Sequence, residues 1–328
     1  MENQSVKSRP VTSRNSGPTG LLVVDKSGGM TSHDVVDRVR RLFHTKRVGH
    51  TGTLDPGATG VLVLCLGQAT RLAEFLTASR KHYRSEIVFG IETDTEDAWG
   101  VTTAERDASG LRAEHVQEAL TRFRGRILQV PPMVSALHHE GKRLYELARE
   151  GVTVERAARE VEIYDLRLTS FEPGDRPVAG LEITCSTGTY IRTLAANIGT
   201  AVGTGAMMRA LRRTWVGQDE ATAFTLGSSE TLETLMERAD AGTLDSALLP
   251  LSAAVASWPQ AWVGDEGMVR IRQGQALEPA MLEHAELRNW GGEEADTPVA
   301  IFDRCGVVCG VGQRTSGSLR PIKVLAYE

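Results

Sequence analysis

The strongest candidate for a reactive group is an aspartate in a run of small residues from Gly49 to Gly60. The run is Gly-His-Thr-Gly-Thr-Leu-Asp-Pro-Gly-Ala-Thr-Gly, and Asp55 is its one acidic residue. Proline fixes its own φ and pushes the residue before it out of the helical region, so the backbone at Asp55 is constrained. The apolar run 61–66 follows and has the length of a buried strand. A rigid loop that enters a buried strand can hold one carboxylate still for chemistry.

Two other interpretations of this run come from the residues alone. Asp-Pro-Gly is also ordinary turn chemistry, in which the aspartate caps its own backbone. A phosphate-binding loop would need a lysine followed by serine or threonine after the last glycine, and no lysine follows these glycines. The residues alone therefore leave Asp55 as either a turn residue or a reactive carboxylate.

Three separated segments, taken together, resemble one family of enzymes. The run 49–60 resembles the active-site motif of the bacterial tRNA pseudouridine-55 synthase family, the TruB family. The segment 188–192, Gly-Thr-Tyr-Ile-Arg, matches a second family element, and Leu-Arg-Arg at 211–213 resembles a third. The resemblance is close over residues 20–214 and thin afterwards.

The resemblance implies roles for three catalytic residues. Asp55 matches the nucleophile, and Arg192 matches the arginine that pairs with it. A guanidinium near a carboxylate favours its ionised form and can bind both of its oxygens. Tyr83 matches a tyrosine that stacks on the target base and is placed to remove a proton. Attack by Asp55 on the sugar and attack on the uracil ring both remain open at this point.

Four further residues are implied to bind substrate. Tyr190 contacts the flipped nucleotide, and Leu211 helps to wall the uracil pocket. His50 occupies the space that the flipped base vacates or braces the loop, and Lys26 lies near the active site. Structural interpretations remain beside these roles: core or edge packing for tyrosine and leucine, and a surface position for Lys26 and Arg192.

The implied reaction breaks the N-glycosidic bond of a uridine, rotates the base and rejoins it through carbon. No redox or phosphoryl step is needed, so no cofactor and no metal are expected. Cys305 and Cys309 have no neighbouring residues typical of a zinc site. The target base must leave the stack to be reached, so the substrate is expected to be the T-arm stem–loop of tRNA, bound by base flipping.

An α+β fold must position these residues. Apolar patterns predict strands at 20–26, 61–66 and 85–90, and helices from Thr31 to about Phe43, over 68–78, 111–123 and 141–151. Three more strands are predicted over 159–164, 166–171 and 181–186. The resemblance implies a mixed, largely antiparallel central sheet flanked by helices, with a small β-rich C-terminal domain. The acidic segment 93–97 lacks the spacing of a calcium loop, so its residues favour a hydrated or capping loop, and the resemblance implies a structural brace.

Length and composition divide the chain. Its 328 residues fit two domains. We expect a disordered tail over 1–19, a catalytic domain over 20–256, and a PUA-like RNA-binding domain over 257–328. Residues 217–300 carry 15 acidic and 4 basic side chains, a local charge of −11, so the chain's net −5 leaves +6 elsewhere. Negative charge over the C-terminal part argues against strong RNA contact there.

The basic residues outside that acidic part cluster at 38–47, 80–84, 122–126 and 209–213. They form a phosphate-binding surface if they share one face, or separate solvated faces if they do not. Nothing in the chain resembles a membrane span or a secretory signal, so we expect a cytoplasmic monomer without an obligatory protein partner. Two other functions remain open: a non-enzymatic RNA-folding module and a guide-RNA-dependent synthase.

Overall fold

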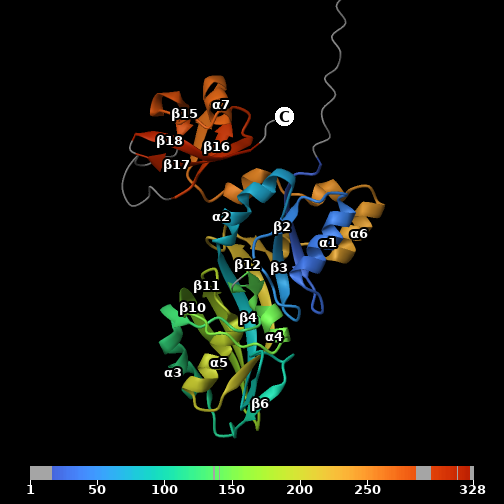
Figure 1. Ribbon diagram of the computed structural model, residues 1–328, viewed down its shortest axis with the longest axis vertical. Helices are drawn as coiled ribbons and strands as arrows, with labels where there is room; N and C mark the ends of the chain where they lie inside the picture. The colour runs from blue at the N-terminus through green and yellow to red at the C-terminus, as the bar shows by residue number, and fades with distance from the viewer. Residues whose placement is uncertain (1–16, 136, 140, 286–296, 316, 326–328) are drawn as a thin grey trace, which may run out of the picture.

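The computed structural model describes residues 17–135, 137–139, 141–285, 297–315 and 317–325 and contains two main sheets (Figure 1). The larger sheet is built from β1 (Gly20–Lys26), β2 (Val48–His50), β3 (Thr59–Leu66), β4 (Arg80–Phe89), β7 (Gly125–Gln129), β10 (Arg159–Glu172), β11 (Val178–Cys185), β12 (Ala206–Gly217) and β13 (Phe224–Thr225). Its order is β1-β3-β12-β4-β11-β10-β7, with β2 on β3 and β13 on β12. Among the described strands of this larger sheet, β3 and β12 are the one parallel pair, so the predicted mixed, largely antiparallel sheet is confirmed.

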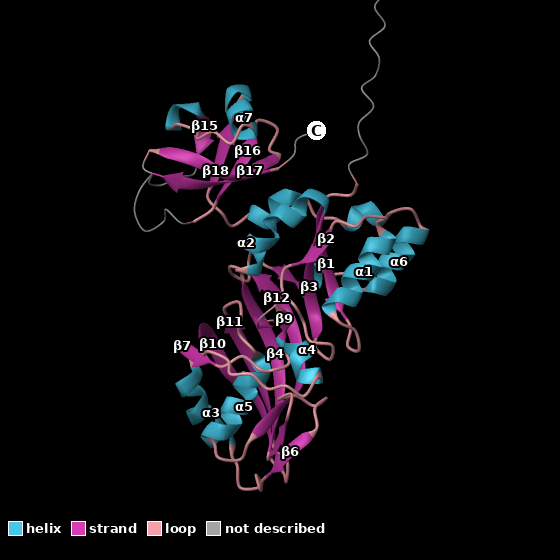
Figure 2. Ribbon diagram, in the orientation of Figure 1, coloured by secondary structure: helices cyan, strands magenta, loops and turns pink. Residues whose placement is uncertain are grey.

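Helices cover one face of this sheet (Figure 2). They are α1 (Ser32–Leu42), α3 (Ala113–Leu120), α5 (Ile191–Ala201) and α6 (Leu232–Asp240). The start of α1 follows from its sequence: the Thr31 hydroxyl accepts from the Asp34 amide, and the Asp34 carboxylate accepts from the Thr31 amide. This capping box satisfies amide groups that the first helical turn leaves unpaired.

Strands β1 and β3 are buried on both faces. Side chains alternate across a strand, so Leu22 and Leu64 enter the core under the helices, whereas Val23 and Val63 enter a second core on the opposite face. Burial on both faces explains why the run after the Asp55 loop is apolar without alternation.

The second sheet forms the C-terminal part. It consists of β14 (Gln260–Val263), β15 (Leu282–Ala285), β16 (Val299–Asp303), β17 (Val308–Thr315) and β18 (Ser318–Val324), in the order β15-β14-β16-β17-β18, and carries α7 (Asp265–Arg272). Phe302 and Val311 share the second core with β1 and β3. The sheet starts beyond the expected boundary at 257, and its PUA-like RNA-binding role stays a prediction. Most of the expected tail lies outside the described residues.

The remaining elements are β5 (Ile91–Thr93), β6 (Thr102–Glu105), β8 (His138–His139), β9 (Lys142–Arg143), α2 (Ala73–Thr77) and α4 (Leu144–Arg149). The predicted helix over 68–78 is a 3-10 helix, Gly67–Leu72, followed by the short α2. The two strands predicted over 159–171 are one strand, β10, with irregular pairing after Ile163 and Leu168. We did not predict β12, because arginines interrupt its apolar pattern.

Candidate active site

The loop that carries Asp55 joins β2 to β3, and side chains from distant elements hold its backbone. Ser32, in the first turn of α1, accepts from the Leu54 amide at 2.8 Å and donates to the Leu54 carbonyl at 3.0 Å. The Ala58 amide donates to the Asp55 carbonyl at 3.1 Å, which closes the predicted turn. Asp55 is therefore both a turn residue and a fixed, accessible carboxylate, with 35% of its side chain exposed.

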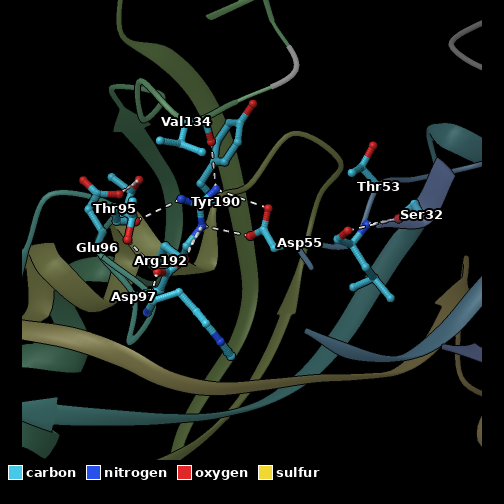
Figure 3. A network of polar contacts seen from close by, with 12 residues as sticks. Ser32, Thr53, Asp55, Thr95, Glu96, Asp97, Val134, Tyr190 and Arg192 are labelled. Atoms are coloured by element: carbon cyan, nitrogen blue, oxygen red, sulfur yellow. Dashed lines mark hydrogen bonds and ion pairs between the residues drawn. The ribbon is translucent and has the colours of Figure 1, made fainter. Parts of the chain in front are cut away.

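Arg192 binds both oxygens of this carboxylate (Figure 3). Its Nε lies 2.8 Å from Asp55 Oδ2, and its Nη2 lies 3.3 Å from Oδ1. The Arg192 side chain is 3% exposed, so water reaches this charged pair from the aspartate side only. A two-point contact of this kind fixes the orientation of the carboxylate as well as its charge.

Backbone carbonyls use the other donors of Arg192. Nη1 donates to the Thr95 carbonyl and Nη2 to the Val134 carbonyl, both at 2.9 Å. Asp97 lies 3.7 Å from Nε and balances part of its charge. The acidic segment between β5 and β6 is therefore the brace that the sequence predicted, and the residue it braces is Arg192 (Figure 3).

The start of α5 places Arg192 in this position. The strand β11 ends at Cys185, and Gly188, at φ +83, turns the chain back toward the sheet. Gln129 then fixes Tyr190 from both sides: its Oε1 accepts from the Tyr190 amide at 2.8 Å, and its Nε2 donates to the Tyr190 carbonyl at 3.0 Å. The Arg192 side chain is thus buried, which rules out the alternative of a surface position.

A cavity of about 330 Å³ opens beside the Asp55 carboxylate. Six of the seven predicted site residues line it: His50, Asp55, Tyr83, Tyr190, Arg192 and Leu211. These residues come from β2, the motif loop, β4, the α5 cap, α5 and β12. The structure thus gathers around one cavity residues that are far apart in the sequence. The His50 ring also accepts from the Gly52 amide at 3.3 Å, which braces the loop.

Lys26 is the one predicted site residue that does not line the cavity. It is fully buried, and its Nζ donates to the carbonyls of Ser27, Met30 and Pro56 at 2.9, 2.7 and 3.1 Å. Burial lowers the pKa of Lys26 to about 8, while the nearby Asp55 acts in the opposite direction. Lys26 is thus close to the nucleophile candidate but lies under the loop, where it holds the backbone.

Arg213, on β12, is a functional residue that we did not single out. Its side chain is 1% exposed, and it donates to the carbonyls of Val61, Gly52 and Thr53 at 2.7, 2.9 and 3.4 Å. It also lines the cavity. The sequence did carry a signal for a buried arginine: Arg212 and Arg213 are consecutive in an apolar run. Neighbouring side chains of a strand point to opposite faces, so one of the two arginines must point into the protein.

Arg213 and Lys81 lie at the cavity beside Tyr83. Burial raises the pKa of the Tyr83 hydroxyl, and the Arg213 guanidinium acts against that rise. Burial, reinforced by Arg213, lowers the pKa of Lys81 to about 8. The Lys81 amine donates to the carbonyls of Thr77 and Ser79, both at 2.7 Å. Tyr83 is therefore a neutral phenol at neutral pH.

A second, larger cavity of about 1080 Å³ meets the first at Asp55. Its wall includes Pro56 and the Asp94–Thr95 segment on one side and residues around α4 on the other. Among the lining residues whose side chains the structure describes there is no lysine or arginine, whereas the first cavity has three cationic side chains. Asp55 thus stands between a small cationic cavity and a wide cavity whose described lining combines apolar side chains, hydroxyls, histidines and carboxylates.

The described residues contain no group of three or more histidine, cysteine, aspartate or glutamate side chains arranged to hold a metal ion. Within the same part of the chain, no helix is long and apolar enough to cross a membrane. The four cysteines are free thiols, of which Cys65, Cys185 and Cys309 are buried.

Comparison with known proteins agrees with this geometry. The TruB family pseudouridylate synthase N-terminal domain matches residues 40–191, and the tRNA pseudouridylate synthase B C-terminal domain matches 192–256. The tRNA pseudouridine synthase B of Symbiobacterium thermophilum is 51% identical over 78% of this chain and 82% of its own. That of Saccharophagus degradans is 39% identical over the full length of both chains.

Solved structures show the same fold at low identity. A chain of an H/ACA ribonucleoprotein bound to a substrate RNA containing 2'-deoxyuridine is similar at a TM-score of 0.69 and 23% identity, over 94% of this chain and 85% of that one. A chain of a Cbf5–Nop10–Gar1 complex also has a TM-score of 0.69, at 24% identity and the same coverage. The close sequence relatives decide the family: this chain belongs to the TruB family of pseudouridylate synthases.

Proposed function

We propose that this protein converts uridine-55 in the T-arm of tRNA to pseudouridine, with Asp55 as the nucleophile and the target base flipped out of its stack. The observation that carries the proposal is the Asp55 carboxylate, bound at both oxygens by buried Arg192 and open to a cavity lined by Tyr83, Tyr190 and Leu211. A carboxylate held this way is oriented and reachable, which are two requirements of a nucleophile.

The reaction balances without an added reagent. The bond between N1 of uracil and C1' of ribose breaks, a bond between C5 and C1' forms, the proton on C5 leaves and N1 gains a proton. Asp55 holds the reacting fragment while the base turns, and it is released at the end. The protein must therefore supply a nucleophile, a confined space for the rotating ring and one proton acceptor.

Tyr83 is the proposed stacking residue and proton acceptor. Burial raises its pKa, so Tyr83 is a neutral phenol at neutral pH and must lose its own proton to water before it can accept the proton from C5. Arg213 is the cation beside it that favours the phenolate. Tyr190 and Leu211 would confine the uracil ring, and His50 would fill the space that the flipped base leaves.

The RNA backbone would contact exposed basic side chains away from the two cavities. Arg38 and Arg41 on α1, and Lys46 and Arg47 on the turn after it, are exposed. In contrast, Arg213 and Lys81 of the predicted basic clusters are buried and unavailable to phosphates. We therefore expect the exposed members of the four clusters, with the α1 end among them, to supply salt-dependent binding.

The test is site-resolved mapping of pseudouridine on an unmodified full-length tRNA transcript incubated with the purified protein alone. The expected result is one pseudouridine, at position 55, and none on a matched transcript with cytidine at that position. Product at another uridine would contradict the proposed target. Product only after a guide RNA and partner proteins are added would favour the guide-dependent class, and binding without product would favour an RNA-folding module.

A further inference from the structure

Trp99 is a large exposed aromatic side chain without an assigned role. It is 59% exposed, on the turn between β5 and β6. Among the described residues the other exposed large aromatic is Tyr164, whose ring is covered by the Arg80 guanidinium at 4.0 Å. More than half of this indole is open to water beside the loop that carries Asp55, so its face is available to stack on a partner.

The covered part of the Trp99 ring rests on the catalytic loop. A Cβ atom added to Gly57 would lie only 2.1 Å from two indole carbons, so the ring packs directly on the Gly57 backbone. Gly57 is two residues after Asp55. The exposed part of the indole therefore lies within one short turn of the proposed nucleophile.

The turn that carries Trp99 is rigid. Asp97 Oδ1 accepts from the Trp99 amide at 3.1 Å and from the Thr95 hydroxyl at 2.6 Å. Two backbone bonds of 3.0 Å fasten the turn to β12, from the Met208 amide to the Glu96 carbonyl and from the Ala98 amide to the Met208 carbonyl. The indole is thus held in place before any partner arrives, so binding to it costs little ordering entropy.

The charges around Trp99 decide which part of an RNA it can contact. The Pro56 and Asp94–Thr95 segments next to it line the wide cavity. Asp94 is exposed there, and the described side chains of the cavity lining include carboxylates but no lysine or arginine. A phosphate would be repelled at this rim, whereas the face of an uncharged base would not. Stacking of a base on an aromatic ring needs no positive charge.

From this geometry we propose that Trp99 stacks on a nucleobase of the RNA strand that flanks the target uridine, at the rim of the wide cavity. The inference rests on the proposed function, because it takes the flipped uridine to be at Asp55. In this arrangement Trp99 is a substrate-binding residue that recognises a base face and contributes no phosphate contact.

The experiment compares Trp99→Ala, Trp99→Phe and Val101→Ser, each with and without Asp55→Asn, on the T-arm stem–loop. Val101 is a matched control, because it lies in the same turn and is 72% exposed but has no ring. Binding is measured at several salt concentrations in the Asp55→Asn background, and kcat and KM in the background that keeps Asp55. We expect Trp99→Ala to raise Kd about tenfold with an unchanged salt slope. Trp99→Phe should have a smaller effect, and Val101→Ser should have none.

A spectroscopic measurement covers the case in which Trp99→Ala does not fold. RNA should quench part of the tryptophan fluorescence of the full chain, and Trp99→Phe should lose that part. A Kd within twofold of the parent for Trp99→Ala, or a lower kcat with unchanged Kd, would overturn the proposal and leave the indole as support for Gly57. Absence of product from the wild type would instead contradict the proposed function, whatever the Trp99 variants do.

Discussion

Two buried arginines, one at the start of α5 and one in the middle of β12, serve the same loop in different ways. Arg192 binds the Asp55 carboxylate and two carbonyls of other loops. The contacts found for Arg213 on this loop are to the carbonyls of Gly52 and Thr53. The first arginine sets the direction of the reactive group, and the second sets the shape of the backbone that carries it.

The difference shows why the site needs two cations near one acid. The Asp55 carboxylate is 35% exposed and can be solvated by water, so its arginine partner mainly orients it. Buried carbonyls have no access to water and need a hydrogen-bond donor from the protein. We therefore expect replacement of Arg192 to act on turnover and replacement of Arg213 to act on stability first.

Replacement of Arg192 should have the largest effect, and the effect should be on catalysis. Arg192→Met removes both contacts to Asp55 and should lower kcat/KM on the T-arm stem–loop by on the order of a thousandfold. Arg192→Lys is the matched variant, since it keeps the charge but cannot bind both oxygens in one plane. Its activity should lie between those of wild type and Arg192→Met. Equal activity of all three in steady-state assays would show that the pair does not orient the nucleophile.

Replacement of Arg213 should act mainly on folding. Arg213→Met leaves the carbonyls of Gly52 and Val61 unpaired in the interior and should lower the free energy of unfolding by about 3 kcal/mol. Urea unfolding followed by circular dichroism measures this change. Arg192→Met, measured in parallel, should lose less stability than Arg213→Met. The opposite order would reverse the roles assigned to the two arginines.

The smallest expected effect is on the pH dependence of stability, and it comes from Lys26, whose buried amine binds carbonyls of the Asp55 loop and of the turn after β1. Its folded pKa of about 8 is below its ordinary value of 10.5, so the unfolded state binds more protons above pH 8 and stability should rise with pH. Above pH 9 the buried thiols act against this rise, because burial raises the pKa of Cys65 to about 12 and that of Cys185 to about 11. The useful window is therefore pH 8 to 9.

The measurement compares the unfolding free energy of wild type and Lys26→Met at pH 8 and pH 9. The wild type should gain about 1 kcal/mol more than the variant across this window. The quantity to compare is the change of the unfolding free energy with pH in each protein. The absolute values differ for another reason, because Lys26→Met also loses three carbonyl contacts and is less stable at every pH. Parallel slopes would show that Lys26 keeps its proton in the folded protein throughout this range.

The sequence predicted the parts of the site that depend on local chemistry. The Asp-Pro-Gly turn, the Thr31 cap of α1 and the buried strand after the loop follow from neighbouring residues. The resemblance added residues that local chemistry could not connect, such as Arg192, which is 137 positions from Asp55. Six of the seven predicted residues line one cavity as a result.

Residues that serve the site through long-range packing could not be predicted. The arginines of β12 interrupt its apolar pattern, and only the pairing with β3 and β4 shows that Arg213 points inward. The burial of Lys26 could not be predicted for the same reason. A lysine at the end of a strand is ordinarily exposed, and three carbonyls from two loops make the burial of this one possible. Trp99 has no local signal, because its contact with Gly57 joins two turns that are distant in the chain.

The most direct test of this account is pseudouridine formation on an unmodified T-arm stem–loop by wild type and by Asp55→Asn, with RNA binding measured on the same samples. Asparagine keeps the size of the side chain but cannot act as the nucleophile. We predict product from the wild type alone, a loss of at least about 10⁴-fold in the variant, and similar binding by both. Equal product from the two proteins would make Asp55 a turn residue and would contradict the account.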